Sequence, residues 1–339
     1  MTIIDVSSEP ELWDEFLQKN DHLIFHTPFY QQFIEKSFGV KYLVLGVIEA
    51  DEIKVILPVV EVHSSLFGNK MISTAYLEYG GFSGDPAYAS SLLDHIDKRY
   101  SKDHDYLEIR GGLELFDGVL SEKLQKSLLY KRFVLSLEGD VWQGIQKSKR
   151  KAINKSLKNV DVRELSAKDI DELYLLYLQN MRSFGSPPYS QNYFVQFFSL
   201  AEKGYAKAFA TFHQGRMVSA LLGFCYGDRV HILIAVSDQK FQELRPNDAM
   251  HWKYIDFAKA HGYRWFDFGR VREESGQFEY KQKWGGTLME LPSYFLLWKA
   301  KEIPLVDPAK YGLLVKIWKR LPLAVTKIVG MKLRRELGI

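Results

Sequence analysis

The chain has 339 residues, more than most single hydrophobic cores hold, so we expect two domains. Its apolar fraction of 46% and charged fraction of 26% are typical of a soluble globular protein, and no apolar run approaches the roughly 18 residues that span a bilayer. The net charge is +3, but residues 299–336 hold ten Lys and Arg against three Asp and Glu, which gives +7 there and −4 elsewhere.

The cellular compartment is indicated by the cysteine content and the N-terminus. A single cysteine, Cys225, excludes an internal disulfide, and its apolar surroundings predict a buried strand residue in a reducing compartment. The N-terminal stretch is acidic and lacks the basic and apolar regions of a secretory signal. We therefore expect a cytoplasmic protein.

The first half of the chain predicts a hairpin between helices. Thr27, Pro28 and Gly39 are suited to the N-cap, first position and C-terminal stop of a helix. Residues 41–62 read as two strands joined by a polar turn at residues 50–52, which predicts an antiparallel hairpin. A helix at 89–100 and a short strand at 105–112 that ends in glycines follow.

The second half repeats this order. Residues 206–236 predict three strands joined at the turn dipeptides Gln214-Gly215 and Gly227-Asp228. A helix at 247–262, with Asn247 as N-cap, and a strand at 263–269 follow. The repeated order indicates an internal duplication, and it predicts an α+β fold in which helices pack on a mixed sheet.

A basic segment lies between these halves. Residues 141–162 place Trp142, Ile145, Lys149 and Ser156 at helical spacing, and six cations with no acid occur between residues 147 and 158. This face is either a solvated surface or a phosphate-binding helix.

The C-terminal segment at residues 310–337 is also basic. Leu313, Ile317 and Trp318 lie on one side of a predicted helix with lysines on another, and Pro322 divides the segment into two short amphipathic helices. Such helices either lie on an anionic membrane surface, here its inner face, or pack back on the first domain.

Four segments carry a resemblance to a known family. They are "WQGIQKSKRKAINKSLKNVDV" (142–162), "MRSFGSPPYSQNYF" (181–194), "RPNDAMHWKYIDFAKAHGYRWFDFGR" (245–270) and "SGQFEYKQKWGG" (275–286). In this order they resemble the FemAB-related proteins, the Fem-type peptidoglycan aminoacyltransferases and their acyltransferase relatives. The resemblance implies two tandem GNAT domains, each a mixed, mostly antiparallel sheet flanked by helices. We expect the first at 1–139, the second at 140–297, and the basic helices at 298–339.

The resemblance also implies an activity. Fem-type enzymes transfer an activated acyl or aminoacyl group to an amine of a cell-wall or other cell-envelope precursor. The sequence lacks the long helical hairpin associated with tRNA contact in Fem enzymes, so the donor stays open between charged tRNA and acyl-CoA or acyl-carrier protein. The alternatives are a CoA-dependent N-acyltransferase acting on a small amine or a sugar, and a non-catalytic binding module. We expect no bound cofactor.

The expected chemistry requires a stabiliser for a tetrahedral oxyanion and does not require a metal. The histidines lack metal-ligand spacing, so no metal site is expected. Lys281 matches the lysine of the F-K-x-x-F/W-G pattern that is tied to the Fem active site, and we interpret it as the oxyanion stabiliser. Arg270 is suited to hold a phosphate or carboxylate, or else forms a surface ion pair. Asp267 is a candidate base, with a structural ion pair as the alternative.

The expected substrate contacts are spread over several segments. Arg245 and Asn247 occupy the place of the pyrophosphate loop of CoA-dependent GNAT enzymes, although no glycine lies between Lys240 and Asp248 and the Asp248 carboxylate would repel a pyrophosphate. The full set of candidate substrate-binding residues is Lys147, Arg150, Lys155, Tyr189, Arg245, Asn247, Phe278 and Trp284.

Overall fold

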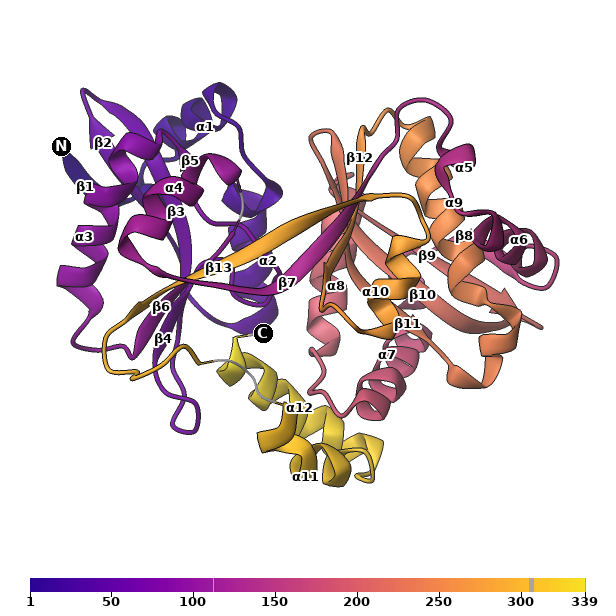
Figure 1. The fold of residues 1–339 in the computed structure, drawn as a ribbon. Coiled ribbons are helices and arrows are strands. Elements are labelled where there is room, and N and C mark those ends of the chain that lie inside the picture. Colours follow the sequence, from indigo (N-terminus) through magenta and orange to yellow (C-terminus); the bar gives the residue numbers. More distant parts are fainter. Residues whose placement is uncertain (112, 305–307, 339) are drawn as a thin grey trace. The chain divides into compact units, whose positions relative to one another are not determined.

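The computed structural model describes residues 1–111, 113–304 and 308–338, and it divides into two compact units (Figure 1). Unit 1 comprises Met1–Leu129, Leu291–Val306 and Arg334–Ile339, and unit 2 comprises Tyr130–Glu290 and Asp307–Leu333. The sequence analysis expected borders at 139/140 and 297/298. Gly112, expected to help end a strand, and residues 305–307 and 339 of the C-terminal segment lie outside the described residues.

The strands of unit 1 form a mixed sheet in the order β1-β2-β3-β4-β6-β13, and β5 pairs with β3. All neighbours are antiparallel except β4 and β6, which are parallel. The strands are β1 (Thr2–Asp5), β2 (Tyr42–Glu49), β3 (Glu52–Val62), β4 (Lys70–Ile72), β5 (Ser83–Gly84), β6 (Tyr106–Arg110) and the unit 1 part of β13 (Thr287–Leu297).

The predicted hairpin at residues 41–62 is confirmed as β2 and β3. Its two turn residues, Ala50 and Asp51, have φ values of 52° and 60°. Positive φ at both central positions produces the turn twist that matches the twist of paired strands. The turn fixes the register, with Glu49 opposite Glu52.

The helices of unit 1 are α1 (Pro10–Lys19), α2 (Pro28–Phe38), α3 (Ala89–Tyr100) and α4 (Asp117–Lys123). The predicted ends of α2 are confirmed, since the Thr27 side chain accepts a hydrogen bond from the Tyr30 amide and Gly39 has φ 62°. One core joins β2, β3 and β6 to α3 and α4 through buried side chains such as Leu57 and Leu92. These contacts bury the apolar stripe of α3 and hold it on the sheet.

The strands of unit 2 follow the order β8-β9-β10-β11-β12-β7, with only β11 and β12 parallel. Across the sheet of each unit, therefore, four antiparallel strands come first. The fifth strand, which the chain reaches through a helix, is parallel to the fourth, and the sixth is antiparallel to the fifth. This shared order agrees with the predicted duplication. The strands are the unit 2 part of β7 (Gln125–Ser136), β8 (Asp161–Glu164), β9 (Ala206–His213), β10 (Arg216–Tyr226), β11 (Arg229–Ser237) and β12 (Trp265–Val271).

Helices cover both faces of the unit 2 sheet. Phe224 of β10 stacks with Phe197 of α8 on one face, while Ser219 of β10 contacts Met250 of α9 on the other. Cys225 is buried, as expected. The helices are α5 (Val141–Gly144), α6 (Lys147–Ser156), α7 (Ile170–Phe184), α8 (Gln191–Glu202), α9 (Pro246–Ala260) and α10 (Gly276–Gln282).

Three sequence-based expectations in unit 2 need correction. The helix expected at 141–162 is two helices, because Ile145 leaves the helical conformation with ψ 135°. Arg245, with φ 56°, is the N-cap of α9 in place of Asn247, and Pro246 occupies the first helical position. The strand expected to end at Gly269 continues to Val271 through a bulge.

The C-terminal segment forms α11 (Pro308–Trp318) and α12 (Leu323–Leu337), separated at Pro322 as predicted. Of the described residues of this segment, 308–333 belong to unit 2 and 334–338 to unit 1, whereas packing on the first domain was one of the two alternatives that the sequence analysis left open. Within unit 2, Lys327 lies over the Tyr174 ring, and Gly330 lies against Pro188. Among the described residues no helix is both long and apolar enough to cross a membrane.

Candidate functional site

Unit 2 contains a pocket of about 260 Å³ at the beginnings of α6, α9 and α10. Its lining combines three cations, one carboxylate, two hydroxyl groups and a glycine. The lining residues are Ser148, Lys149, Arg245, Gly276, Glu279, Tyr280 and Lys283. Arg245 and Lys283 are exposed at the surface, so the positive charge of the pocket faces solvent.

Lys149 is the most unusual residue of this pocket, because its side chain is buried although it carries an ammonium group. Only 4% of Lys149 and 2% of Asp248 are exposed, and the Lys149 Nζ atom lies 2.7 Å from the Asp248 Oδ1 atom. The same Nζ atom lies 3.7 Å from the centre of the Tyr280 ring and 5.1 Å from that of the Trp284 ring. A carboxylate and two aromatic faces therefore replace the water that the ammonium loses on burial.

Burial lowers the pKa of Lys149 below its usual value, while the Asp248 charge and hydrogen bond oppose this shift. Asp248 also pairs with Arg245, whose Nε atom lies 3.3 Å from the Asp248 Oδ2 atom. The Asp248 carboxylate is thus held between two cations. Its predicted repulsion of an anionic ligand is accordingly offset by the residues around it.

The backbone around the pocket adds to the positive potential. Ser148 and Lys149 lie in the first turn of α6, whose N-cap residue Gln146 makes no side-chain cap hydrogen bond. Arg245 is the N-cap of α9, where no side-chain cap hydrogen bond is present either. Uncapped amides and the positive end of a helix dipole favour anions. The cations and helix N-termini of the pocket therefore favour an anionic group such as a phosphate or carboxylate, although the Glu279 carboxylate opposes it.

His251 lies behind the pocket and is fully buried. Its Nδ1 atom is 2.8 Å from the Asn247 carbonyl oxygen and 3.2 Å from the Tyr280 hydroxyl. Burial lowers the pKa of His251 to about 3, so the ring is neutral at physiological pH. The ring packs against Tyr280 and helps to hold that side chain in place.

The three predicted catalytic residues lie near one another, at the end of β12. The Lys281 Nζ atom donates hydrogen bonds of 2.9 Å to the carbonyl oxygens of Gly269 and Arg270. The Arg270 guanidinium lies 4.8 Å from the centre of the Tyr130 ring. Asp267 is fully buried and forms an ion pair of 2.9 Å with Arg132.

Lys281 lies on α10 and fixes the backbone of the β12 bulge through these two hydrogen bonds. Asp267 accepts a further hydrogen bond from the Gly269 amide. This buried, paired carboxylate corresponds to the structural alternative that the sequence analysis left open. None of the three lines the pocket beside Lys149.

The predicted substrate-binding residues divide into two groups. Arg245 lines the pocket, and the Asn247 side chain donates to the Ser237 hydroxyl at 3.3 Å. The other six do not line the pocket. Lys147 and Lys155 are exposed, Arg150 donates a hydrogen bond to Gln143, and the Phe278 ring lies edge-on to the Phe133 ring. Tyr189 and Trp284 are buried.

The expectation that Tyr189 and Trp284 contact a substrate needs correction. Both side chains are buried in packed cores, where they cannot touch a ligand. Tyr189 stacks on Tyr193 with ring centres 4.3 Å apart, and Trp284 packs near Phe268 and His251. Both rings hold the elements around a site in place rather than lining it.

Lys149, Tyr280 and Lys283 were missed as site residues. Lys149 gave a signal in the sequence, since it falls among apolar residues at helical spacing, where a buried lysine needs a partner. Its partner, Asp248, is far away in the sequence and was interpreted there as a carboxylate that would repel a pyrophosphate. Tyr280 and Lys283 lie in the motif that drew attention to Lys281.

Comparisons with known proteins agree with this fold. The family model of the acetyltransferase (GNAT) domain matches residues 144–282, a range that contains all the pocket residues except Lys283. A search of curated proteins gives no match.

Several solved structures share the fold of most of the chain. FemX matches with a TM-score of 0.68 and 13% identity, over 93% of this chain and 100% of FemX. L-PGS from Bacillus licheniformis matches with a TM-score of 0.58 and 13% identity, over 92% and 98%. A tandem GNAT protein from the clavulanic acid biosynthesis pathway matches with a TM-score of 0.57 and 8% identity, over 88% and 96%. Residues 144–282 therefore match the acetyltransferase (GNAT) domain family, and the fold of the chain is similar to that of FemX and of a tandem GNAT protein.

Proposed function

We propose that this acyltransferase transfers an activated acyl or aminoacyl group to an amine of a peptidoglycan or other cell-envelope precursor. The observation that supports this proposal most directly is the pocket beside Lys149, which presents cations and helix N-termini within the GNAT domain. Activated acyl donors and envelope precursors both carry phosphates, and such a pocket suits a phosphate. The similarity to the fold of FemX favours a Fem-like acceptor.

In this proposal Arg245 and Lys283 hold an anionic part of one substrate, while Lys149 keeps the wall of the pocket in place through Asp248. Lys281 and Arg270 act at the end of β12, where the ammonium of Lys281 stabilises the oxyanion of the tetrahedral intermediate. The donated hydrogen bonds to Gly269 and Arg270 hold that ammonium in a fixed position. A preorganised charge stabilises an oxyanion more than a mobile one does.

The alternative is a CoA-dependent N-acyltransferase. The observation in its favour is the neutralisation of Asp248 by Lys149 and Arg245, which removes the main electrostatic objection to a pyrophosphate at the start of α9. Charged tRNA and acyl-CoA thus remain competing donors, and a direct comparison separates them.

The test measures transfer of a labelled acyl group from acetyl-CoA or from charged tRNA to a UDP-linked muropeptide. We expect transfer from charged tRNA, with a KM for one substrate that rises at least tenfold in Lys283→Met. The matched control is Lys151→Met, since Lys151 is exposed on α6 and does not line the pocket. Transfer from acetyl-CoA alone moves the assignment to the alternative. A protein that binds the muropeptide but transfers nothing from either donor supports a binding module.

We also propose that α11 and α12 contact an anionic membrane surface. Large apolar side chains are exposed on both helices, including Leu313, Ile317 and Ile328 at 72%, 50% and 67%. Exposed Lys316, Lys319, Arg320 and Lys332 lie among them. Apolar side chains interleaved with lysines suit the interface of anionic lipids, where the acceptor of this reaction is carried if it is lipid-linked.

Co-sedimentation with vesicles tests the membrane contact. We expect binding to phosphatidylglycerol-containing vesicles but not to pure phosphatidylcholine vesicles, and at least fivefold weaker binding in Ile317→Ser. The control is Leu175→Ser, because Leu175 is as exposed as Ile317 but lies on α7. Equal binding of the wild type to both kinds of vesicle contradicts the proposal.

A further inference from the structure

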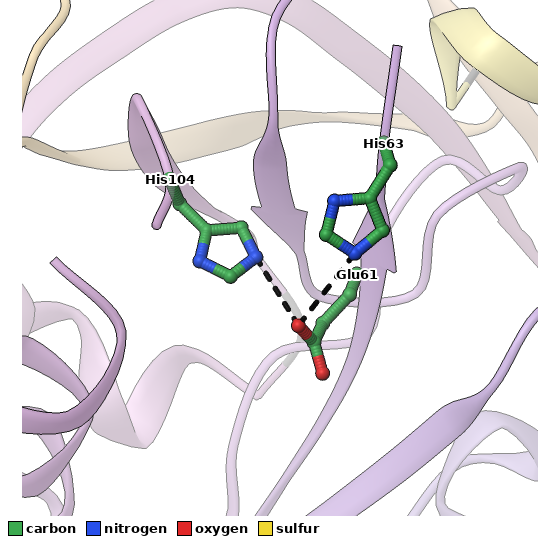
Figure 2. Close-up of side chains that lie close together, drawn as sticks. All are labelled: Glu61, His63 and His104. Carbon is green, nitrogen blue, oxygen red and sulfur yellow. Dashed lines mark ion pairs between the residues drawn. The ribbon is translucent and has the colours of Figure 1, made fainter. Parts of the chain in front are cut away.

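Three potential metal ligands come together in unit 1, away from the pocket of unit 2. Glu61 lies near the end of β3, His63 follows that strand directly, and His104 lies just before β6 (Figure 2). Glu61 and His63 are two residues apart on extended chain, so their side chains point to the same side. The connection between α3 and β6 brings His104 to them.

The spacing of the ligand atoms fits one metal ion. All three atoms lie within 4.8 Å of one another. The Glu61 Oε2 atom is 3.2 Å from the His104 Nε2 atom and 3.9 Å from the His63 Nε2 atom. Ligands placed about 2.1 Å from a tetrahedral metal lie roughly 3.4 Å apart, so these separations require little adjustment.

His104 supplies a second, independent observation. Its side chain is almost wholly buried, between the rings of Tyr100 and Trp298. The Nδ1 atom lies 3.1 Å from the Tyr100 carbonyl oxygen, which places the proton of a neutral ring on Nδ1. The buried Nε2 atom lies 3.2 Å from the Glu61 Oε2 atom (Figure 2), so in a neutral ring with its proton on Nδ1 the Nε2 lone pair faces this carboxylate.

A lone pair directed at a carboxylate oxygen is unfavourable unless a positive charge lies between them. Metal-bound histidines characteristically donate their other ring N–H to a carbonyl or carboxylate, as His104 does to Tyr100. We propose that Glu61, His63 and His104 bind a divalent metal ion of the zinc type. Two imidazole nitrogens and one carboxylate oxygen form a donor set that suits Zn²⁺ better than Mg²⁺ or Ca²⁺.

The site leaves a fourth coordination position on its solvent side. The His63 side chain is 61% exposed, whereas His104 is buried, so water reaches the ion past His63. The ion ties the end of β3 to the chain that enters β6, across the short strand β4 that pairs with both. The sequence analysis expected no metal site, because His104 is distant in sequence and the other two ligands lack a recognised motif.

The test uses full-length, tag-free protein that has been treated with a chelator and is titrated with ZnCl2 in a calorimeter. We expect one Zn²⁺ ion per chain, with an affinity at least tenfold lower in His63→Ala and in Glu61→Gln, and no competition from a large excess of Mg²⁺. His63 and Glu61 are not fully buried, so these variants keep the fold, which circular dichroism verifies. The matched control is His261→Ala, because His261 is an exposed histidine of unit 2. The Zn²⁺ affinity of this variant is expected to equal that of the wild type.

Two results overturn the proposal. One is wild-type protein that binds no Zn²⁺, which makes the cluster an ion pair of a protonated histidine with Glu61. The other is Zn²⁺ binding that is unchanged in both His63→Ala and Glu61→Gln, which places the ion at other side chains.

Discussion

Lys149 illustrates how a buried charge is accommodated at a functional position. Its ammonium is paired with Asp248 and covered by the rings of Tyr280 and Trp284. Removing one member of such a pair leaves an uncompensated charge in a region of low dielectric constant, which costs far more than the pair itself contributes.

The two members of this pair are not equivalent, which gives the first prediction. Asp248→Asn leaves the Lys149 ammonium without a counter-charge and is expected to lower the free energy of unfolding by about 3 kcal/mol. Lys149→Met is expected to cost less, because Asp248 keeps its contact with Arg245. Urea denaturation of both single variants and of the double variant measures the coupling. A double variant whose loss equals the sum of the single losses contradicts this interpretation.

Lys281 carries the second prediction. Replacement by Met removes the two hydrogen bonds to the carbonyls of Gly269 and Arg270 and the proposed oxyanion contact. We expect kcat to fall about 10²-fold or more while KM changes little, since the lost interaction forms in the transition state. Steady-state kinetics of Lys281→Met and of Lys281→Arg provide the measurement. A variant with wild-type kcat contradicts a catalytic role.

Residues of the site were predictable where they lie in a motif and not where they depend on a distant partner. Arg245, which was singled out because it occupies the place of the pyrophosphate loop of CoA-dependent GNAT enzymes, does line the pocket. Lys149 was named only among the residues at helical spacing, because its pairing with Asp248 depends on the packing of α6 on α9. Trp284 was expected in a binding site although it is buried, because the sequence pattern of an aromatic residue beside cations is the same for a pocket wall and for a hydrophobic core.

At the scale of single elements, sequence signals for helix ends and turns were reliable where the residues that carry the signal also form the end or turn. Thr27 and Gly39 end α2 as predicted, and Gln214-Gly215 forms the turn between β9 and β10 with φ values of 50° and 77°. The break at Ile145 was not predicted, although Gly144 directly precedes it. It follows from tertiary packing, since the amide of Gln146 bonds to the Lys283 carbonyl.

The third prediction concerns the packing of α12 against Pro188. Gly330 is buried, and a Cβ atom there would lie inside the van der Waals radius of the Pro188 ring. We expect Gly330→Ala to displace α12 and to increase hydrogen exchange of its amides at least tenfold, because the overlap costs about 1–3 kcal/mol. Gly312→Ala is the control, since nothing lies near its Cβ position and alanine favours a helix. Equal exchange in both variants contradicts the contact.

At the scale of the whole molecule, the order of helices and strands was easier to predict than the pairing of strands. The repeated order of a strand meander, helix and strand indicated two similar α+β units, and the resemblance to the FemAB-related proteins implied that both are GNAT domains. In the pairing of β6 with β13, Ile109 lies opposite Tyr294. No local sequence pattern predicts a pairing between residues that are so far apart in the sequence. Strand pairing at this separation depends on the folded chain rather than on local propensity.

The whole molecule is also expected to be sensitive to acid, because each unit buries a neutral histidine. Burial lowers the pKa of His26 in unit 1 to about 4 and that of His251 in unit 2 to about 3. In the unfolded chain both titrate near the ordinary value of 6.5, so below that pH the unfolded state binds more protons than the folded state. Stability is therefore fully present above pH 6.5 and is lost as the pH falls towards the folded-state values.

The fourth prediction follows from this sign. Between pH 7.5 and pH 5 each histidine is expected to reduce the free energy of unfolding by about 2 kcal/mol, as measured by urea denaturation at the two pH values. His251→Phe removes one titrating group and keeps a ring against Phe268, so its loss between the two pH values should be smaller than that of the wild type. The exposed histidine variant His261→Phe should retain the full wild-type loss. If His251→Phe loses as much stability on acidification as the wild type does, the acid sensitivity arises from other groups, and the buried neutral ring is not its cause.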